Sequence, residues 1–209
     1  NFRLMPDHER PRRPLLSGDF TPNPPAGFVE LGITTPFSFL RGASTADELV
    51  LTAHALGHDA IGVADLNSLA GVVRLHVAAV RAQMRPLIGA RLVLADGTAY
   101  LAYPTDRAAY GRLSTLISKG RRHDLDGNWQ AKGACDLSLD DLAAHAEGLQ
   151  LIWIPPERCT HADLAVLPSL AARLPGLRHV AASYLYRGDD VARINRLDRA
   201  AKAAGLAIL

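Results

Sequence analysis

The sequence predicts one α/β domain built on a largely parallel sheet, open or closed into a barrel. Three predicted helices end at a glycine that leads directly into an apolar run, at Leu56 with Gly57, Glu147 with Gly148, and Ala204 with Gly205. Glycine adopts the left-handed conformation that ends many helices. Repeated strand and helix units of this kind indicate parallel strands in one sheet. A chain of 209 residues is long enough to bury a single core.

The first of these units, residues 28–67, is the candidate functional stretch. Residues 29–33 and 60–64 are short and apolar, which predicts two buried strands. Between them, Ser44 and Thr45 are N-cap candidates with Asp47 or Glu48 three residues later, a pattern typical of a helix start. The second strand brings Asp65 to its carboxyl end, where parallel α/β folds gather functional groups. Asp65 is therefore a candidate metal or catalytic carboxylate, and a turn or N-cap aspartate is the alternative.

Apolar side chains that follow the two strands are expected to face the core. The loop after Pro36 is too apolar for a solvated connection, so we expect Phe37, Phe39 and Leu40 to plug one end of the core. A second helix is predicted over residues 68–83. Its inward side is expected to consist of Leu69, Val72, Val73, His76, Val77 and Val80.

The later elements continue the pattern with one interruption. Asp96 and Gly97 lie between two apolar runs and predict a β-hairpin. Residues 1–27 are rich in proline and predict an irregular or disordered leader, so the domain spans residues 28–209 and is expected to be truncated inside its last strand. The remaining predicted elements are helices over 106–117, 139–147, 162–174 and 189–204, and strands over 149–154, 179–183 and 206–209.

Composition gives little guidance about partners and more about compartment. Lys and Arg number 23 against 21 acidic residues, so the net charge of +2 is no argument for a nucleic-acid partner. The basic residues on and after the 106–117 helix could face DNA, but their spacing favours a solvated face. Cys135 and Cys159 lie far apart, and the chain lacks a signal-peptide pattern and a long apolar run. We therefore expect a cytoplasmic, soluble protein with two free thiols.

The usual catalytic motifs are missing from the sequence. It contains no Ser/His/Asp grouping, Walker loop, cysteine pair or dinucleotide-binding glycine motif. His54, His76 and His145 lie within predicted helices, and none pairs with another histidine at metal-ligand spacing. The residues alone offer no ready nucleophile.

Several segments resemble a known family in the right order. They read ELGITTPFSFLRGAS, ALGHDAIGVADLNSLAGVVRLH and PLIGARL. Together they resemble the polymerase and histidinol phosphatase (PHP) domain that opens bacterial C-family DNA polymerases, and they are most similar to the error-prone translesion branch. The resemblance covers residues 28–209. It implies a PHP-type distorted (β/α)7 barrel, incomplete at the C-terminus of this chain.

The resemblance also identifies five degenerate metal-site positions. Metal-binding members carry His-x-His where this chain has Gly32 and Thr34, Asp-His where it has Asp65 and Leu66, and a glutamate where it has Arg91. Loss of a single residue that hydrogen-bonds a metal ligand typically weakens metal affinity about 10- to 100-fold. Losing four ligand positions, one of them to a cation, is expected to abolish it. A further hypothesis is that Arg91 pairs with Asp65 and fills the empty site.

The function implied by the resemblance is a structural, non-catalytic PHP domain of an error-prone DNA polymerase. The parent would add nucleotides on a DNA template in damage-induced translesion synthesis, using carboxylate-bound Mg²⁺ in a polymerase module outside this chain. The implied partners are the remainder of the polymerase chain, DNA, the sliding clamp and accessory mutagenesis proteins, with no membrane. Two alternatives stay open: an active metal-dependent phosphoesterase or proofreading nuclease, and a stand-alone binding domain.

Overall fold

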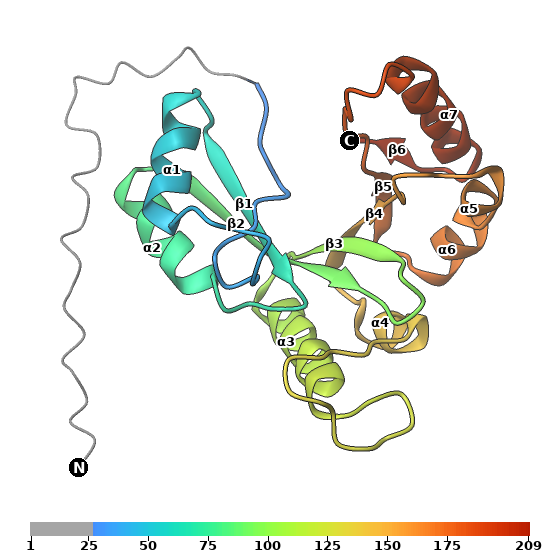
Figure 1. Ribbon diagram of the computed structural model, residues 1–209, viewed down its shortest axis with the longest axis horizontal. Helices are drawn as coiled ribbons and strands as arrows, with labels where there is room; N and C mark the ends of the chain where they lie inside the picture. The colour runs from blue at the N-terminus through green and yellow to red at the C-terminus, as the bar shows by residue number, and fades with distance from the viewer. Residues whose placement is uncertain (1–26) are drawn as a thin grey trace.

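The computed structural model describes residues 27–209 and shows a curved six-stranded sheet with helices on its outer side (Figure 1). The predicted leader lies outside the described residues except for Gly27. The strands are β1 (Ala60–Leu66), β2 (Arg85–Val93), β3 (Ala99–Pro104), β4 (Leu149–Ile154), β5 (Leu177–Val180) and β6 (Ala207–Ile208). The helices are α1 (Ala46–Ala55), α2 (Val72–Arg81), α3 (Arg107–Arg122), α4 (Leu139–His145), α5 (His161–Ala165), α6 (Leu167–Arg173) and α7 (Asp190–Ala203).

The strands follow one another across the sheet in chain order. β1 pairs with β2, β4 with β5 and β5 with β6 in parallel, whereas β3 is antiparallel to both of its neighbours. β3 forms the predicted hairpin with β2, and the turn between the two strands contains Gly97 at φ +85°. In the described part of the chain β1 and β6 do not pair, so the sheet is an open arc. The predicted strand at 29–33 is reduced to an extended segment with a single bridge from Ile33 to Val63.

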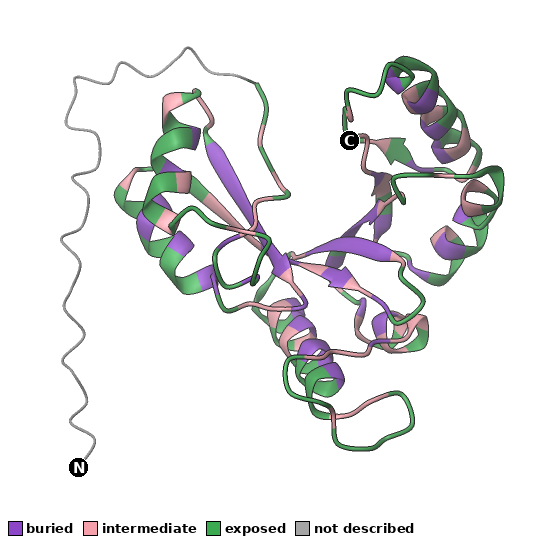
Figure 2. Ribbon diagram, in the orientation of Figure 1, coloured by how far each residue is buried: buried purple, intermediate pink, exposed green. Residues whose placement is uncertain are grey.

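Two hydrophobic clusters lie between the sheet and its helices. One cluster packs β1 against α1 and α2. The larger cluster packs the four strands β2, β3, β4 and β5 against α3, α4, α6 and α7. Figure 2 shows the buried residues along the strands and on the inward faces of these helices. A small third cluster of Ala64, Leu101 and Ile152 occupies the opposite, concave face. Tyr103 also packs there, and its hydroxyl donates to the Leu31 carbonyl. The concave face is therefore partly covered by the chain's own side chains.

The local signals in the sequence formed as predicted. Thr45 and Glu48 make a capping box at the start of α1. Asp106 caps α3. Gly57, Gly148 and Gly205 adopt φ values of +81°, +71° and +72° after their helices. These helix ends are fixed by hydrogen bonds between residues only a few positions apart. The local sequence therefore predicts them well.

Two helix predictions were wrong in detail. The single helix predicted over 162–174 is two helices, α5 and α6, with Pro168 in the first turn of α6. In α2, Leu75, Ala78 and Ala79 face the core, whereas Val73 is 70% exposed and Val77 and Val80 are also exposed. The buried face of α2 therefore combines Leu75 with two alanines, and three of the valines expected to face inward lie on the exposed side.

Two further observations concern the cysteines and the length of the helices. Cys135 and Cys159 are free thiols, as expected. Among residues 27–209, the structure contains no helix of the length and apolar character that crossing a membrane requires.

Candidate functional site

Asp65 is the buried carboxylate at the carboxyl end of β1. It is only 1% exposed, and its strand lies against β2 with Asp65 opposite Ala90. Oδ1 accepts hydrogen bonds from the Thr35 amide at 2.9 Å and the Ser38 hydroxyl at 2.7 Å, and Oδ2 accepts one from the Thr35 hydroxyl at 2.8 Å. A buried carboxylate needs such partners because its desolvation is costly. Asp65 therefore anchors the loop that contains Thr35 and Ser38.

The anchored loop faces the opposite way from the prediction. Thr35 and Ser38 are buried, whereas Phe37, Phe39 and Leu40 are 46%, 84% and 89% exposed. The predicted apolar plug is therefore wrong. Pro36 and Phe37 between the two polar anchors, and Phe39 and Leu40 after them, are exposed while the anchors turn toward Asp65. The need to satisfy a buried charge outweighs the gain from burying two phenylalanines.

Gly71 closes the other side of the carboxylate. A Cβ built on Gly71 would lie 2.3 Å from Asp65 Oδ2 and 2.3 Å from the Thr35 hydroxyl oxygen. Real Cβ atoms do not approach this closely, so the start of α2 can pack here only with glycine. The Ser38 hydroxyl also accepts from the Leu66 amide at 2.9 Å. The Asp65 carboxylate is thus enclosed by hydrogen bonds and by backbone.

The other four metal-site positions carry no anionic or imidazole ligand. Gly32 is exposed and its amide donates to Glu30 Oε1 at 2.6 Å. The Thr34 hydroxyl lies 3.4 Å from the Gly32 carbonyl oxygen. Leu66 and Arg91 are partly buried and stand opposite each other on β1 and β2.

The hypothesis that Arg91 pairs with Asp65 is wrong. The ion pairs formed within residues 27–209 do not include one between these side chains, and both oxygens of Asp65 accept hydrogen bonds from Thr35 or Ser38 instead. The Arg91 Nε atom is buried and has no hydrogen-bond partner among the described residues. Burial, and next the charge of Arg41, lower the pKa of the Arg91 guanidinium below its usual value. Among residues 27–209, Arg91 therefore takes part in no ion pair.

These residues do not fit the metal that the family resemblance implies. Catalytic zinc, manganese and iron sites use several histidine, cysteine or carboxylate ligands. In the part of the chain that the structure describes, no three such side chains gather closely enough to hold an ion. Of the five metal-site positions, only Asp65 has a ligand side chain, and its oxygens already accept three hydrogen bonds. We derive no metal-dependent step for this site.

The sequence prediction missed the residues that connect this site to its surroundings. Asn67 adopts φ +43°, and its side chain bonds both the carbonyl and the amide of Val93 at 3.1 and 2.9 Å. Arg121 Nε donates to the Asn67 carbonyl at 2.9 Å. Asparagine tolerates this conformation better than most residues, so an Asn directly after a strand was the available signal. Nothing local indicated that Arg121, 54 residues away, would reach it.

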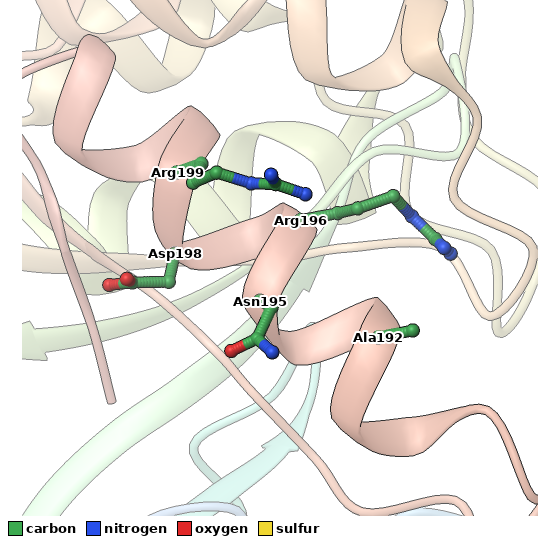
Figure 3. A pocket seen from close by; sticks show the side chains of 5 residues that line it. All are labelled: Ala192, Asn195, Arg196, Asp198 and Arg199. Carbon is green, nitrogen blue, oxygen red and sulfur yellow. The ribbon is translucent and has the colours of Figure 1, made fainter.

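A surface hollow on α7 is a weaker candidate. It has a volume of about 490 Å³ and is lined by Ala192, Asn195, Arg196, Asp198 and Arg199. Figure 3 shows Arg196 and Arg199 extending to one side of the helix and the Asp198 carboxylate to the other. All five residues come from one helix, whereas ligand sites gather polar groups from several elements around a concave surface. We assign it no function.

The fold and the strand-end aspartate can now be compared with known proteins. Residues 30–203 match the family described as PHP domain. The chain therefore belongs to the PHP domain family. Within it, the chain is 48% identical over 183 residues to an error-prone DNA polymerase of Rhodopseudomonas palustris, covering 85% of this chain. It is 43% identical over 186 residues to one of Caulobacter vibrioides, covering 88% of this chain. The chain spans only 16% and 17% of the length of these two relatives.

Solved structures agree on the fold. A candidate metal-dependent phosphoesterase from Bifidobacterium adolescentis superposes with a TM-score of 0.65 at 17% identity, covering 89% of this chain and 87% of that one. An amidohydrolase from Chromobacterium violaceum, solved with bound sulfate and no metal, gives 0.59 at 16% identity, covering 86% and 84%. At these identities the likeness establishes the PHP-type α/β fold alone.

Proposed function

We propose that this chain is a non-catalytic, structural PHP domain of an error-prone DNA polymerase. The observation that carries the proposal is the state of Asp65. It is the one ligand side chain among the five metal-site positions, and three hydrogen bonds from Thr35 and Ser38 hold it. A carboxylate used in this way acts as a structural anchor, because both of its oxygens hold the loop of Thr35 and Ser38 in place.

The role of the parent protein is part of the same proposal. By similarity to the error-prone polymerases, the whole protein would add nucleotides on a DNA template during translesion synthesis after DNA damage, in the cytoplasm. Carboxylate-bound Mg²⁺ in the polymerase module would supply the chemistry. The remainder of the polymerase chain would contact this domain, and the sliding clamp and accessory mutagenesis proteins would act with the parent.

Metal content is the test. The purified 209-residue chain, expressed with zinc, manganese and iron supplied, is expected to contain far less than one metal ion per chain after dialysis. It is also expected to release no phosphate from a phosphomonoester above the level of a denatured sample. Stoichiometric tightly bound metal together with phosphate release would overturn the proposal in favour of an active phosphoesterase. A metal-bearing PHP phosphoesterase, handled in parallel, controls for loss of metal during purification.

A further inference from the structure

The helix α2 has an apolar side that faces outward as well as the one that it buries. Its outward valines, which we call the valine stripe, are Val73, Val77 and Val80, and they are 70%, 41% and 55% exposed. Their spacings of four and three residues place them on one side of the helix. The opposite side, with Leu75 and Ala79, packs into the cluster between β1 and α1. The hydrophobic clusters of residues 27–209 do not include the valine stripe.

The valine stripe does not serve the stability of the helix itself. Valine is a weaker helix former than leucine, lysine or glutamate, because its branched Cβ loses rotamer freedom against the preceding turn. At an exposed position, little burial of apolar surface offsets this loss. The exposed residues of α3, by contrast, are all polar or small: Arg107, Ala108, Gly111, Thr115, Ser118, Lys119, Arg121 and Arg122. The outer side of α2 therefore has the composition of a surface that a partner covers.

Basic side chains border the valine stripe along one edge. With 3.6 residues per turn, Arg74 and Arg81 both lie about 80–100° around the helix axis from Val73. Both arginines are exposed, and within residues 27–209 neither takes part in an ion pair. The Arg74 guanidinium lies 5.3 Å from the centre of the half-exposed Phe37 ring, and α2 itself contains no acidic residue. An apolar centre with arginine beside it is typical of a protein–protein interface.

The small area of this surface favours a partner within the same polypeptide. The helix has 10 residues, so it is about 15 Å long, and with a width of about 10 Å its outer side presents roughly 150 Å². A stable complex of two separate proteins buries about 800 Å² on each partner. A segment of the same chain needs less, because the covalent connection keeps it at a high effective concentration. The chain spans 16% and 17% of the two polymerases compared above, so most of each relative lies outside the matched region.

We propose that the outer side of α2 is the surface on which the remainder of the polymerase chain docks. An apolar surface of that remainder packs on the valine stripe, and acidic side chains beside it pair with Arg74 and Arg81. The inference rests on the proposed function, because it takes the remainder of an error-prone DNA polymerase as the partner. Nucleic acid fits this surface poorly, because phosphates placed on the valine stripe would lose their hydration without gaining hydrogen-bond donors there.

The experiment measures side-chain accessibility in the full-length parent polymerase by hydroxyl-radical labelling and mass spectrometry. Val191 is the reference because it matches Val73: each is the second residue of its helix, and their exposed fractions are 64% and 70%. A free surface predicts equal labelling of these two valines. The docked surface predicts that Val73 and Val80 are labelled at least about threefold less than Val191, because apolar side chains at the centre of an interface lose their contact with water.

A lysine in the valine stripe tests the docking directly. Val73→Lys in the parent is expected to raise the labelling of Val77 and Val80 at least about threefold, because an unpaired ammonium group cannot stay buried under the docked segment. Val73 is mostly exposed in this domain, and lysine is a better helix former than valine, so the domain itself tolerates the change. Val191→Lys is the matched control and should leave the labelling of the valine stripe unchanged. Arg74→Gln with Arg81→Gln should raise that labelling less, by about twofold.

The other outcomes each overturn the docking surface. Equal labelling of Val73 and Val191 in the wild-type parent would show that the outer side of α2 is free. Protection that is lost on dilution would assign the surface to a second copy of the chain, and protection that needs added DNA would assign it to nucleic acid. A Val191→Lys effect as large as that of Val73→Lys would show general loosening of the domain. Metal content and phosphate release play no part in this readout, so stoichiometric metal would overturn the proposed non-catalytic role and leave the docking surface standing, and the reverse also holds.

Discussion

Two buried aspartates, Asp65 and Asp190, each anchor a loop, and they do so in different ways. Asp65 lies near the carboxyl end of β1 and is held by two hydroxyls and one amide. Asp190 begins α7 after β5 and accepts from the amides of Leu185 at 2.7 Å and Arg187 at 3.0 Å. Its Oδ1 also lies 3.3 Å from a guanidinium nitrogen of Arg193. Each anchored loop turns aromatic side chains outward, Phe37 and Phe39 in one case and Tyr184 and Tyr186 in the other.

The difference lies in how the charge is balanced. Asp190 and Arg193 form a buried ion pair, and Arg193 also donates to the Ser183 carbonyl. Asp65 is held by neutral donors alone, and the ion pairs formed within residues 27–209 do not include it. One buried carboxylate is thus stabilised by hydroxyl and amide dipoles, and the other also by a charged partner that is itself buried.

The substitution with the largest expected effect is Asp65→Ala, which removes the acceptor for three buried donors and tests whether Asp65 anchors the loop. Each buried donor left without a partner costs about 1–3 kcal/mol. Because the freed loop can partly reach water, we expect a total loss of about 3 kcal/mol in the free energy of unfolding, measured by urea denaturation. Asp59→Ala, at the exposed turn before the same strand, is the control and should change stability by less than about 0.5 kcal/mol. Equal effects would show that Asp65 does not anchor the loop.

A second change tests the enclosure of Asp65 without removing its charge. Gly71→Ala places a Cβ 2.3 Å from Asp65 Oδ2 and from the Thr35 hydroxyl. Overpacking of this kind typically costs about 1–3 kcal/mol, and we expect about 2 kcal/mol by urea denaturation. Gly111→Ala is the matched control, because Gly111 lies within α3 with open space at its Cβ. It should stabilise the chain by about 0.5–1 kcal/mol. A neutral Gly71→Ala would contradict the close packing against the carboxylate.

The surroundings of Asp65 also show how much of the structure could be predicted from the sequence. Boundaries set by neighbouring residues, such as the capping box at Thr45 and the glycine after α1, were predicted correctly. The same is true of the position of Asp65 at a strand end. Its partners Thr35 and Ser38 lie 30 and 27 residues away in sequence, and no local pattern connects them.

The prediction that the loop after Pro36 is buried failed for a related reason. Phe37 and Phe39 were expected inside because hydrophobicity was considered residue by residue. The demand of a buried carboxylate for donors is a property of the folded neighbourhood, and here it fixes which side of the loop faces inward. The α2 face was misassigned in the same way, because Leu75 and Ala79 are buried whereas Val73 is exposed. Polar satisfaction and close packing therefore decided what apolar content alone could not.

The smallest expected effect concerns Asp190 and distinguishes its ion-paired anchor from Asp65. The amide of Leu185, then that of Arg187, and the Arg193 guanidinium lower the pKa of the Asp190 carboxyl below its usual range. A carboxyl whose pKa is lower in the folded state contributes stability above its unfolded pKa, and that contribution is lost as pH falls through the folded value. We therefore expect the wild-type chain to lose stability on acidification below about pH 4, the region of an unperturbed aspartate. Asp190→Asn should lose less over the same interval, while remaining less stable than wild type at neutral pH. Urea denaturation at a series of pH values gives both curves, and parallel curves would show that the Asp190 charge contributes nothing to the anchor.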